Sequence, residues 1–96
     1  MPGFEFFGDE ERKEVNEVLE TGILMRYGFD GPRKGIWKSK ELEAAVSTVF
    51  GCAHAQLTSS GTAALTTAMA ALGIGVGDEV IMPSFTFVAS FEAILS

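Results

Sequence analysis

The sequence has few of the residues that mark disulfide-rich, membrane-spanning or nucleic-acid-binding proteins. A single cysteine, Cys52, excludes an internal disulfide and suits the reducing cytoplasm, and we interpret it as a small buried residue. The chain has seven lysine and arginine residues and 13 acidic residues, so it lacks the basic surface that binds nucleic acids and anionic membranes. No apolar run approaches the ~20 residues that span a bilayer, and no signal-peptide pattern is visible. We expect a cytoplasmic protein without nucleic-acid, membrane or metal partners.

The residue pattern of the first half of the chain predicts two helices and a loop. Residues 9–20 begin with acidic side chains, which favour a helix N-terminus, and they end before Gly22. Residues 39–50 place apolar side chains at helical spacing, with Ser39 as the N-cap and Gly51 as the terminator. The intervening residues 22–38 have no clear period. They predict a long irregular loop, a kind of segment that often carries function.

The second half of the chain alternates between patterns typical of strands and of helices. Residues 54–58 and 79–82 are predicted strands, and residues 62–72 a helix that is buried on most sides. A last helix is predicted from about Thr86. This order of elements favours an α/β fold with parallel strands.

We therefore divide the chain into two regions. Residues 1–53 form an N-terminal helical segment, and residues 54–96 form the start of a truncated α/β domain. We expect a truncation because the last apolar helix has no terminator, and because two strands alone leave sheet edges and helix faces uncovered.

The sharpest motif is Ser60-Gly61-Thr62, where the first predicted strand meets the following helix. A helix start offers free backbone N–H groups and the positive end of its dipole, Gly61 lets an anion approach, and the two hydroxyls add donors. These features predict a phosphate cradle. Taken alone, however, the triplet is more economically explained as a helix N-cap. Neither a P-loop nor a dinucleotide-binding glycine pattern is present.

Two aromatic residues follow the second predicted strand, in the run Pro83-Ser84-Phe85-Thr86-Phe87. In an open α/β sheet, ligands bind beyond the carboxyl ends of the strands, and an aromatic ring placed there can stack on a planar heterocycle. From the pattern alone, Phe85 and Phe87 are at least as easily explained as residues of the hydrophobic core.

Three blocks together carry a resemblance to a known family. They are SSGTAAL at residues 59–65, ALGIGVGDEVI at residues 71–81 and PSFTFVAS at residues 83–90. In order and spacing they resemble the DegT/DnrJ/EryC1/StrS aminotransferases, and the amphipathic helix that opens with KELE at residues 40–43 is also similar to the family pattern. The likeness covers nearly the whole chain.

The resemblance implies a pyridoxal 5'-phosphate (PLP) enzyme of fold type I, usually a homodimer or a higher homo-oligomer. Such enzymes commonly move an amino group from glutamate to a keto- or aldehydo-sugar in polysaccharide biosynthesis. By position, Gly61 and Thr62, with Ser60 beside them, match the residues that hold the cofactor phosphate. Phe87 matches the aromatic residue that stacks on the pyridine ring. A phosphorylated pyridine needs both sites, so the resemblance agrees with the two motifs.

A narrower resemblance concerns the substrate. Met1-Pro2-Gly3-Phe4-Glu5, Arg26-Tyr27 and Trp37-Lys38 look like the subgroup that makes 8-amino-3,8-dideoxy-manno-octulosonate for lipopolysaccharide. Under this hypothesis the loop at residues 22–38 contributes to the substrate end of the site. Arg26 is then a candidate to bind a carboxylate or phosphate, although a solvated arginine explains it as simply.

The lysine that binds PLP covalently in this family has no counterpart here. All four lysines, Lys13, Lys34, Lys38 and Lys40, precede the cradle, so no catalytic residue is predicted in the chain, which alone is expected to be inactive. Three hypotheses stay open: part of an aminotransferase, a non-catalytic phosphate-binding α/β module, or a small self-associating protein.

Overall fold

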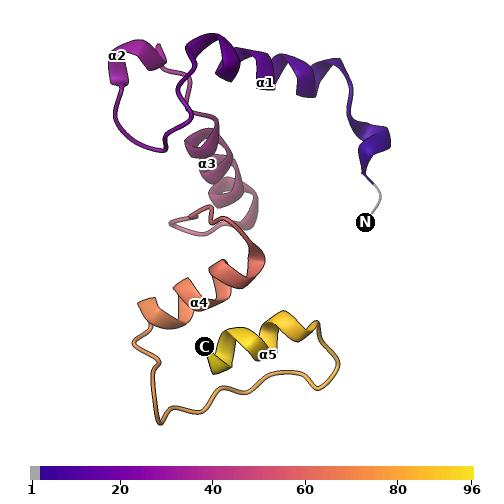
Figure 1. Cartoon of the computed structure of the whole chain (residues 1–96), viewed down its shortest axis with the longest axis vertical. Helices are drawn as coiled ribbons and strands as arrows, with labels where there is room; N and C mark the ends of the chain where they lie inside the picture. Colours follow the sequence, from indigo (N-terminus) through magenta and orange to yellow (C-terminus); the bar gives the residue numbers. More distant parts are fainter. Residues whose placement is uncertain (1–2) are drawn as a thin grey trace. The chain divides into compact units, whose positions relative to one another are not determined.

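Helices are the regular secondary structure in the part of the chain that the structure describes, and irregular segments connect them. A computed structural model describes residues 3–96, which form a short 3-10 helix and five α-helices (Figure 1). In chain order these elements are η1 (Phe4–Phe6), α1 (Asp9–Thr21), α2 (Asp30–Arg33), α3 (Lys38–Phe50), α4 (Gly61–Ala71) and α5 (Val88–Leu95). Met1 and Pro2 of the block quoted for the substrate subgroup lie outside the described residues.

The predicted α/β fold is wrong for this chain, because residues 3–96 contain no strand. Residues 54–58 and 79–82 are irregular instead. A strand exists only when its backbone groups pair with a neighbour, and among the described residues the backbone of residues 79–82 forms no hydrogen bond. A sheet of two short strands is marginal without a third strand or a covering helix. The apolar character of residues 79–82 was therefore not sufficient evidence for a strand.

The helix ends follow local chemistry, and most of the predicted ends are confirmed. Gly22 and Gly51 adopt left-handed φ angles of 68° and 65° after α1 and α3, as expected of C-terminal glycines. At the start of α1, the Glu11 carboxylate accepts a hydrogen bond of 2.9 Å from the Gly8 N–H. The predicted cap at Ser39 is wrong: α3 begins at Lys38, and Trp37 is its N-cap, without a side-chain capping bond.

The chain divides into two compact units, Met1–Ala55 and Gln56–Ser96, here called unit 1 and unit 2. Unit 2 consists of α4, α5 and the turn between them, and the two helices pack against each other. Its turn closes through Asp78, whose carboxylate accepts the Gly75 N–H at 2.7 Å and whose N–H donates to the Gly75 carbonyl at 3.0 Å. Residues 73–78 thus form the predicted turn.

Little apolar surface is buried in either unit. Ala93 in α5 is the one buried hydrophobic residue among residues 3–96. The expectation that α4 is buried on most sides is wrong, because this helix contains no buried residue. Cys52 is likewise exposed rather than buried. Large apolar side chains of unit 2 lie fully exposed, notably Val76, Ile81 and Phe85.

Candidate functional site

The start of α4 has the geometry of a capped helix N-terminus. Ser60 is the N-cap in extended conformation, and its Oγ accepts a hydrogen bond of 3.0 Å from the Ala63 N–H. The Ser60 carbonyl accepts the Ala64 N–H at 3.0 Å and the Thr58 hydroxyl at 2.9 Å. The capping function left open by the sequence is therefore present, and it uses one of the first free N–H groups of the helix.

The remaining donors at this end are open to a ligand. Within the described residues, the N–H groups of Gly61 and Thr62 have no hydrogen-bond acceptor. A Cβ added to Gly61 would meet no atom within 4 Å, so the space in front of this backbone is free. The first turn of α4 also carries no acidic side chain that would repel an anion. These properties fit a phosphate group.

Unit 2 has no basic side chain with which to neutralise such an anion. Residues 56–96 contain no lysine, arginine or histidine, and their acidic residues are Asp78, Glu79 and Glu92. Within this unit, a phosphate at the start of α4 would be bound by backbone N–H groups, hydroxyl donors and the helix dipole alone.

Phe87 occupies the corresponding position on the next helix. It is the N-cap of α5, its side chain is 76% exposed, and no aromatic contact fixes its ring. In unit 2, α4 and α5 run in the same direction, so both helices begin at one end of the pair (Figure 1). The structure therefore brings the starts of α4 and α5 to the same end of the unit.

The main groove of unit 2 lies elsewhere. It is lined by the second half of α4, the turn at residues 74–78 and the last residues of α5, and it contains none of the predicted cofactor residues. We therefore base the candidate site on the open donors of α4 and not on this groove.

Comparison with known families decides the relationship. The sequence model of the DegT/DnrJ/EryC1/StrS aminotransferase family matches residues 6–96, which is almost the entire chain. The chain belongs to this family. The match includes α4, α5 and the irregular segment before α3. Membership of the DegT/DnrJ/EryC1/StrS family makes aminotransferase the relevant enzyme class.

The loop predicted at residues 22–38 contains an ordered segment that sequence reasoning missed. Arg33, at the end of α2, is only 4% exposed. Its guanidinium donates hydrogen bonds to the carbonyl of Gly28, at 3.1 Å, and to the carbonyl of Met25, and it lies 4.1 Å from the centroid of the Trp37 ring. The Trp37 indole N–H in turn donates to the Arg26 carbonyl at 2.6 Å. We call residues 25–37 the arginine-tied loop.

The only signal for this arrangement in the sequence is the spacing of Arg33 and Trp37. Trp37 follows Arg33 by four positions, and a planar cation close in sequence to an aromatic ring can stack on it. Because residues 22–38 have no clear period, the sequence predicted an irregular loop, and the burial of Arg33 was not predicted.

Arg26, the candidate for a substrate carboxylate or phosphate, already has an acidic partner. Its Nη2 donates to Glu43 Oε1 of α3 at 2.5 Å, and the Glu43 side chain is only 12% exposed. The Arg26 charge therefore joins the arginine-tied loop to α3, and binding a substrate anion would compete with that ion pair.

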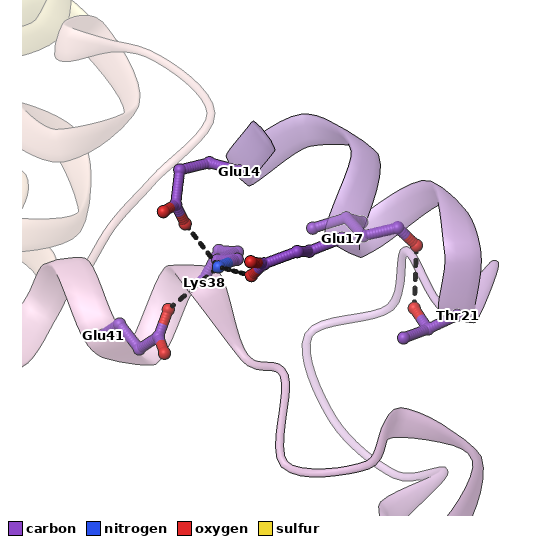
Figure 2. Close-up of polar contacts among 6 residues, drawn as sticks. Glu14, Glu17, Thr21, Lys38 and Glu41 are labelled. Atoms are coloured by element: carbon purple, nitrogen blue, oxygen red, sulfur yellow. Dashed lines mark hydrogen bonds and ion pairs between the residues drawn. The ribbon is translucent and has the colours of Figure 1, made fainter. Parts of the chain in front are cut away.

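A second charge cluster joins α1 to α3. Lys38, at the start of α3, donates hydrogen bonds to Glu14 and to Glu17 of α1, the latter at 2.5 Å, and lies 3.8 Å from Glu41 (Figure 2). Hydrogen bonds to Glu14 and Glu17 raise the pKa of Lys38 above its ordinary value, while the Lys38 hydrogen bond lowers the pKa of Glu17. We call Lys38, Glu14, Glu17 and Glu41 the Lys38 cluster.

Across residues 3–96, no group of three or more His, Cys, Asp or Glu side chains is arranged to hold a metal ion. None of the helices in that range combines the length and the apolar character needed to cross a bilayer.

Proposed function

We propose that this chain is the N-terminal part of a PLP-dependent aminotransferase that transfers an amino group from glutamate to a keto- or aldehydo-sugar. The family match over residues 6–96 carries the proposal, because it includes all the residues that we assign to the cofactor. The proposed sugar is a precursor of cell-surface polysaccharide, with the octulosonate of lipopolysaccharide as the narrower candidate. The proposed protein acts as a cytoplasmic homodimer or higher homo-oligomer.

In this proposal, the start of α4 binds the phosphate of PLP. The N–H groups of Gly61 and Thr62 have no acceptor within the described residues, and Gly61 has no side chain to obstruct an anion. The hydroxyls of Ser60 and Thr62 add further donors. Phe87 covers one face of the pyridine ring. Bound PLP supplies the electron sink for amino transfer, and these four residues of the chain hold and orient it.

The catalytic lysine is proposed to lie outside residues 1–96. The four lysines of this chain all precede α4, and two of them are engaged in unit 1: Lys38 with its carboxylates and Lys40 over the Trp37 ring at 3.6 Å. We therefore propose that the 96-residue chain alone is inactive.

The first test is to read the gene beyond the Ser96 codon and to assay its complete product. We expect an in-frame continuation that encodes a lysine-bearing segment, and a product that forms 2-oxoglutarate from glutamate when a keto-sugar is supplied. A gene that stops at Ser96, or a complete product that transfers no amino group, would overturn the proposal. Binding of phosphate without amino transfer would favour a binding module, and concentration-dependent light scattering would favour a self-associating protein.

The second test addresses the cradle directly. We expect Gly61→Val in the complete gene product to weaken PLP binding about tenfold or more, because the added side chain fills the space that the phosphate needs and keeps the phosphate out of hydrogen-bond reach of the backbone N–H groups. Gly75→Val is the matched control: Gly75 also has open space around an added Cβ, and it lies in the turn of unit 2. Equal PLP affinities of the two variants, measured by absorbance titration, would remove the cradle from the proposal.

A further inference from the structure

A cleft within unit 1 lies between α1 and α3, at the Lys38 cluster. Side chains of both helices line it: the apolar residues Val15, Val18 and Leu42, and the charged residues Glu14, Lys38 and Glu41. The two glutamates come from different helices, Glu14 from α1 and Glu41 from α3 (Figure 2). Two helices thus form one concave surface that combines exposed apolar side chains with carboxylates. We call it the α1–α3 cleft.

The charge of the α1–α3 cleft is not balanced. Its one cation, Lys38, forms ion pairs with three carboxylates, those of Glu14, Glu17 and Glu41. The whole of α1 has the same excess, because it carries six acidic side chains and two basic ones. The side chains of Glu14 and Glu41 are 57% and 60% exposed, so a further cation can reach both carboxylates. The cleft therefore attracts positively charged groups.

The shape and the chemistry of the cleft together indicate what complements it. A third helix packs naturally into the groove between two others, and an amphipathic helix places its apolar face there. Lysine and arginine next to that face can lay their aliphatic stems on apolar surface while their charged ends reach carboxylates. Such a helix would bring apolar side chains to Val15 and Leu42 and its cations to Glu14 and Glu41. An acidic helix would be repelled by the same two carboxylates.

We propose that the α1–α3 cleft binds a basic amphipathic helix of a partner protein. The partner is not a second copy of this chain, because α4 and α5 contain no basic residue and α1 is itself acidic. The two lysines of α3 are already engaged, Lys38 with its carboxylates and Lys40 over the Trp37 ring. The proposal is independent of the proposed function, because the cleft contains none of the residues that we assign to PLP.

The charge requirement is tested by titrating the complete gene product with a fluorescein-labelled peptide and measuring anisotropy. The peptide has 13 residues, the length of α1 and of α3, with leucine on one helical face and lysine beside it. We expect the double variant Glu14→Gln/Glu41→Gln to bind it about tenfold more weakly, while Glu17 keeps Lys38 paired. The matched control is Glu10→Gln/Glu20→Gln, which removes the same charge from exposed positions of α1 outside the cleft and should change the affinity less than about twofold.

The apolar requirement is tested with the same peptide. Leu42→Ala should weaken binding about fivefold, and Leu24→Ala, at an exposed leucine of unit 1 outside the cleft, should leave it unchanged. A peptide with glutamate in place of lysine should not bind. Equal affinities of the two double variants would overturn the proposal, because the peptide would then respond only to net charge. A complete gene product that does not bind the lysine peptide would also overturn it, since the product itself or a second copy would then cover the cleft.

Discussion

The contacts inside unit 1 differ in kind from the contacts inside unit 2. In unit 1, ion pairs and side-chain hydrogen bonds around Arg33, Lys38 and the Arg26–Glu43 pair connect the elements. In unit 2, which has no basic residue, α4 and α5 meet through small and apolar side chains, of which Ala93 is buried. The contacts that connect the elements are therefore mostly polar or charged in unit 1 and apolar in unit 2.

This difference has consequences for what each unit needs from its surroundings. The charged groups of Arg26, Arg33 and Lys38 find their partners within unit 1. Unit 2 leaves Phe85, Ile81 and Val76 at 99% exposure or more. Apolar surface of that extent is typical of regions that other protein surface covers. We therefore predict that the stability of unit 2 depends on apolar packing and that the stability of unit 1 depends on charge. Substitutions in each unit can test the two dependences separately.

The largest effect is expected from Ala93→Glu in unit 2. Ala93 is 4% exposed where α5 packs against α4, so a longer, charged side chain would be both overpacked and desolvated. We expect a loss of about 2–3 kcal/mol in the packing of α5. Hydrogen exchange of the α4 and α5 amides would show it as lost protection.

The control for this substitution is Ala68→Glu, which makes the same chemical change at an exposed position of α4. Protection in α4 and α5 should be nearly unchanged in that variant, and Trp37 emission should be unchanged in both. A response of Trp37 to Ala93→Glu would mean that the two units are not independently held.

A smaller effect of opposite sign is expected at Lys34 in unit 1. Lys34 has a φ angle of 53°, which glycine adopts without the steric cost that other residues incur, so Lys34→Gly should stabilise the loop by about 1 kcal/mol. The urea midpoint of Trp37 emission should rise. Lys13→Gly, in the interior of α1, should instead destabilise its helix by about 1 kcal/mol, since glycine is a poor helix former there. A fall in the midpoint for Lys34→Gly would show that Lys34 makes contacts that outweigh its backbone strain.

The helices were predictable because they depend on local chemistry. The periodicity of residues 39–50, the glycines after α1 and α3, and the serine before α4 are short-range signals, and the four predicted helices begin within two residues of their predicted starts. The short helices η1 and α2 were not predicted, and α2 lies within the predicted irregular loop. Pairing of residues 54–58 and 79–82 is a long-range property, and no local pattern reveals whether a neighbouring strand exists. The α/β prediction failed at that step.

The candidate site shows the same division. The capping geometry of Ser60 and the open backbone at Gly61 follow from an N-cap followed by glycine, and both were predictable. The burial of Arg33 was not, because an arginine beside Gly31 and Pro32 gives no sign that it will satisfy carbonyls five and eight residues earlier. The assignment of Ser60, Gly61, Thr62 and Phe87 to PLP stays a prediction until the cofactor is titrated.

The smallest effect, and the most direct test of charge in unit 1, concerns the Lys38 cluster. The pKa of Glu17 is lowered in the folded chain, so its stabilisation is present above the ordinary value of 4.5 and is lost as the pH falls through the lowered value. The pKa of Lys38 is raised, so its stabilisation is present below the ordinary value of 10.5 and is lost as the pH rises through the raised value. The link between α1 and α3 should therefore be strongest between these limits, and weaker in high salt.

Spin labels at Asn16 of α1 and Ala45 of α3, in a Cys52→Ser background, would measure this link as an inter-helix distance distribution. We expect the distribution to broaden at either pH extreme or in 1 M salt, while protection of α4 and α5 does not fall with salt, because apolar packing is not screened. Lys38→Met keeps the aliphatic stem and removes the charge, so its distribution should already be broad at neutral pH and should not respond to salt. If the Lys38→Met distribution is as narrow as that of the parent chain, then the Lys38 charge does not hold α1 on α3, and the contrast between the two units disappears.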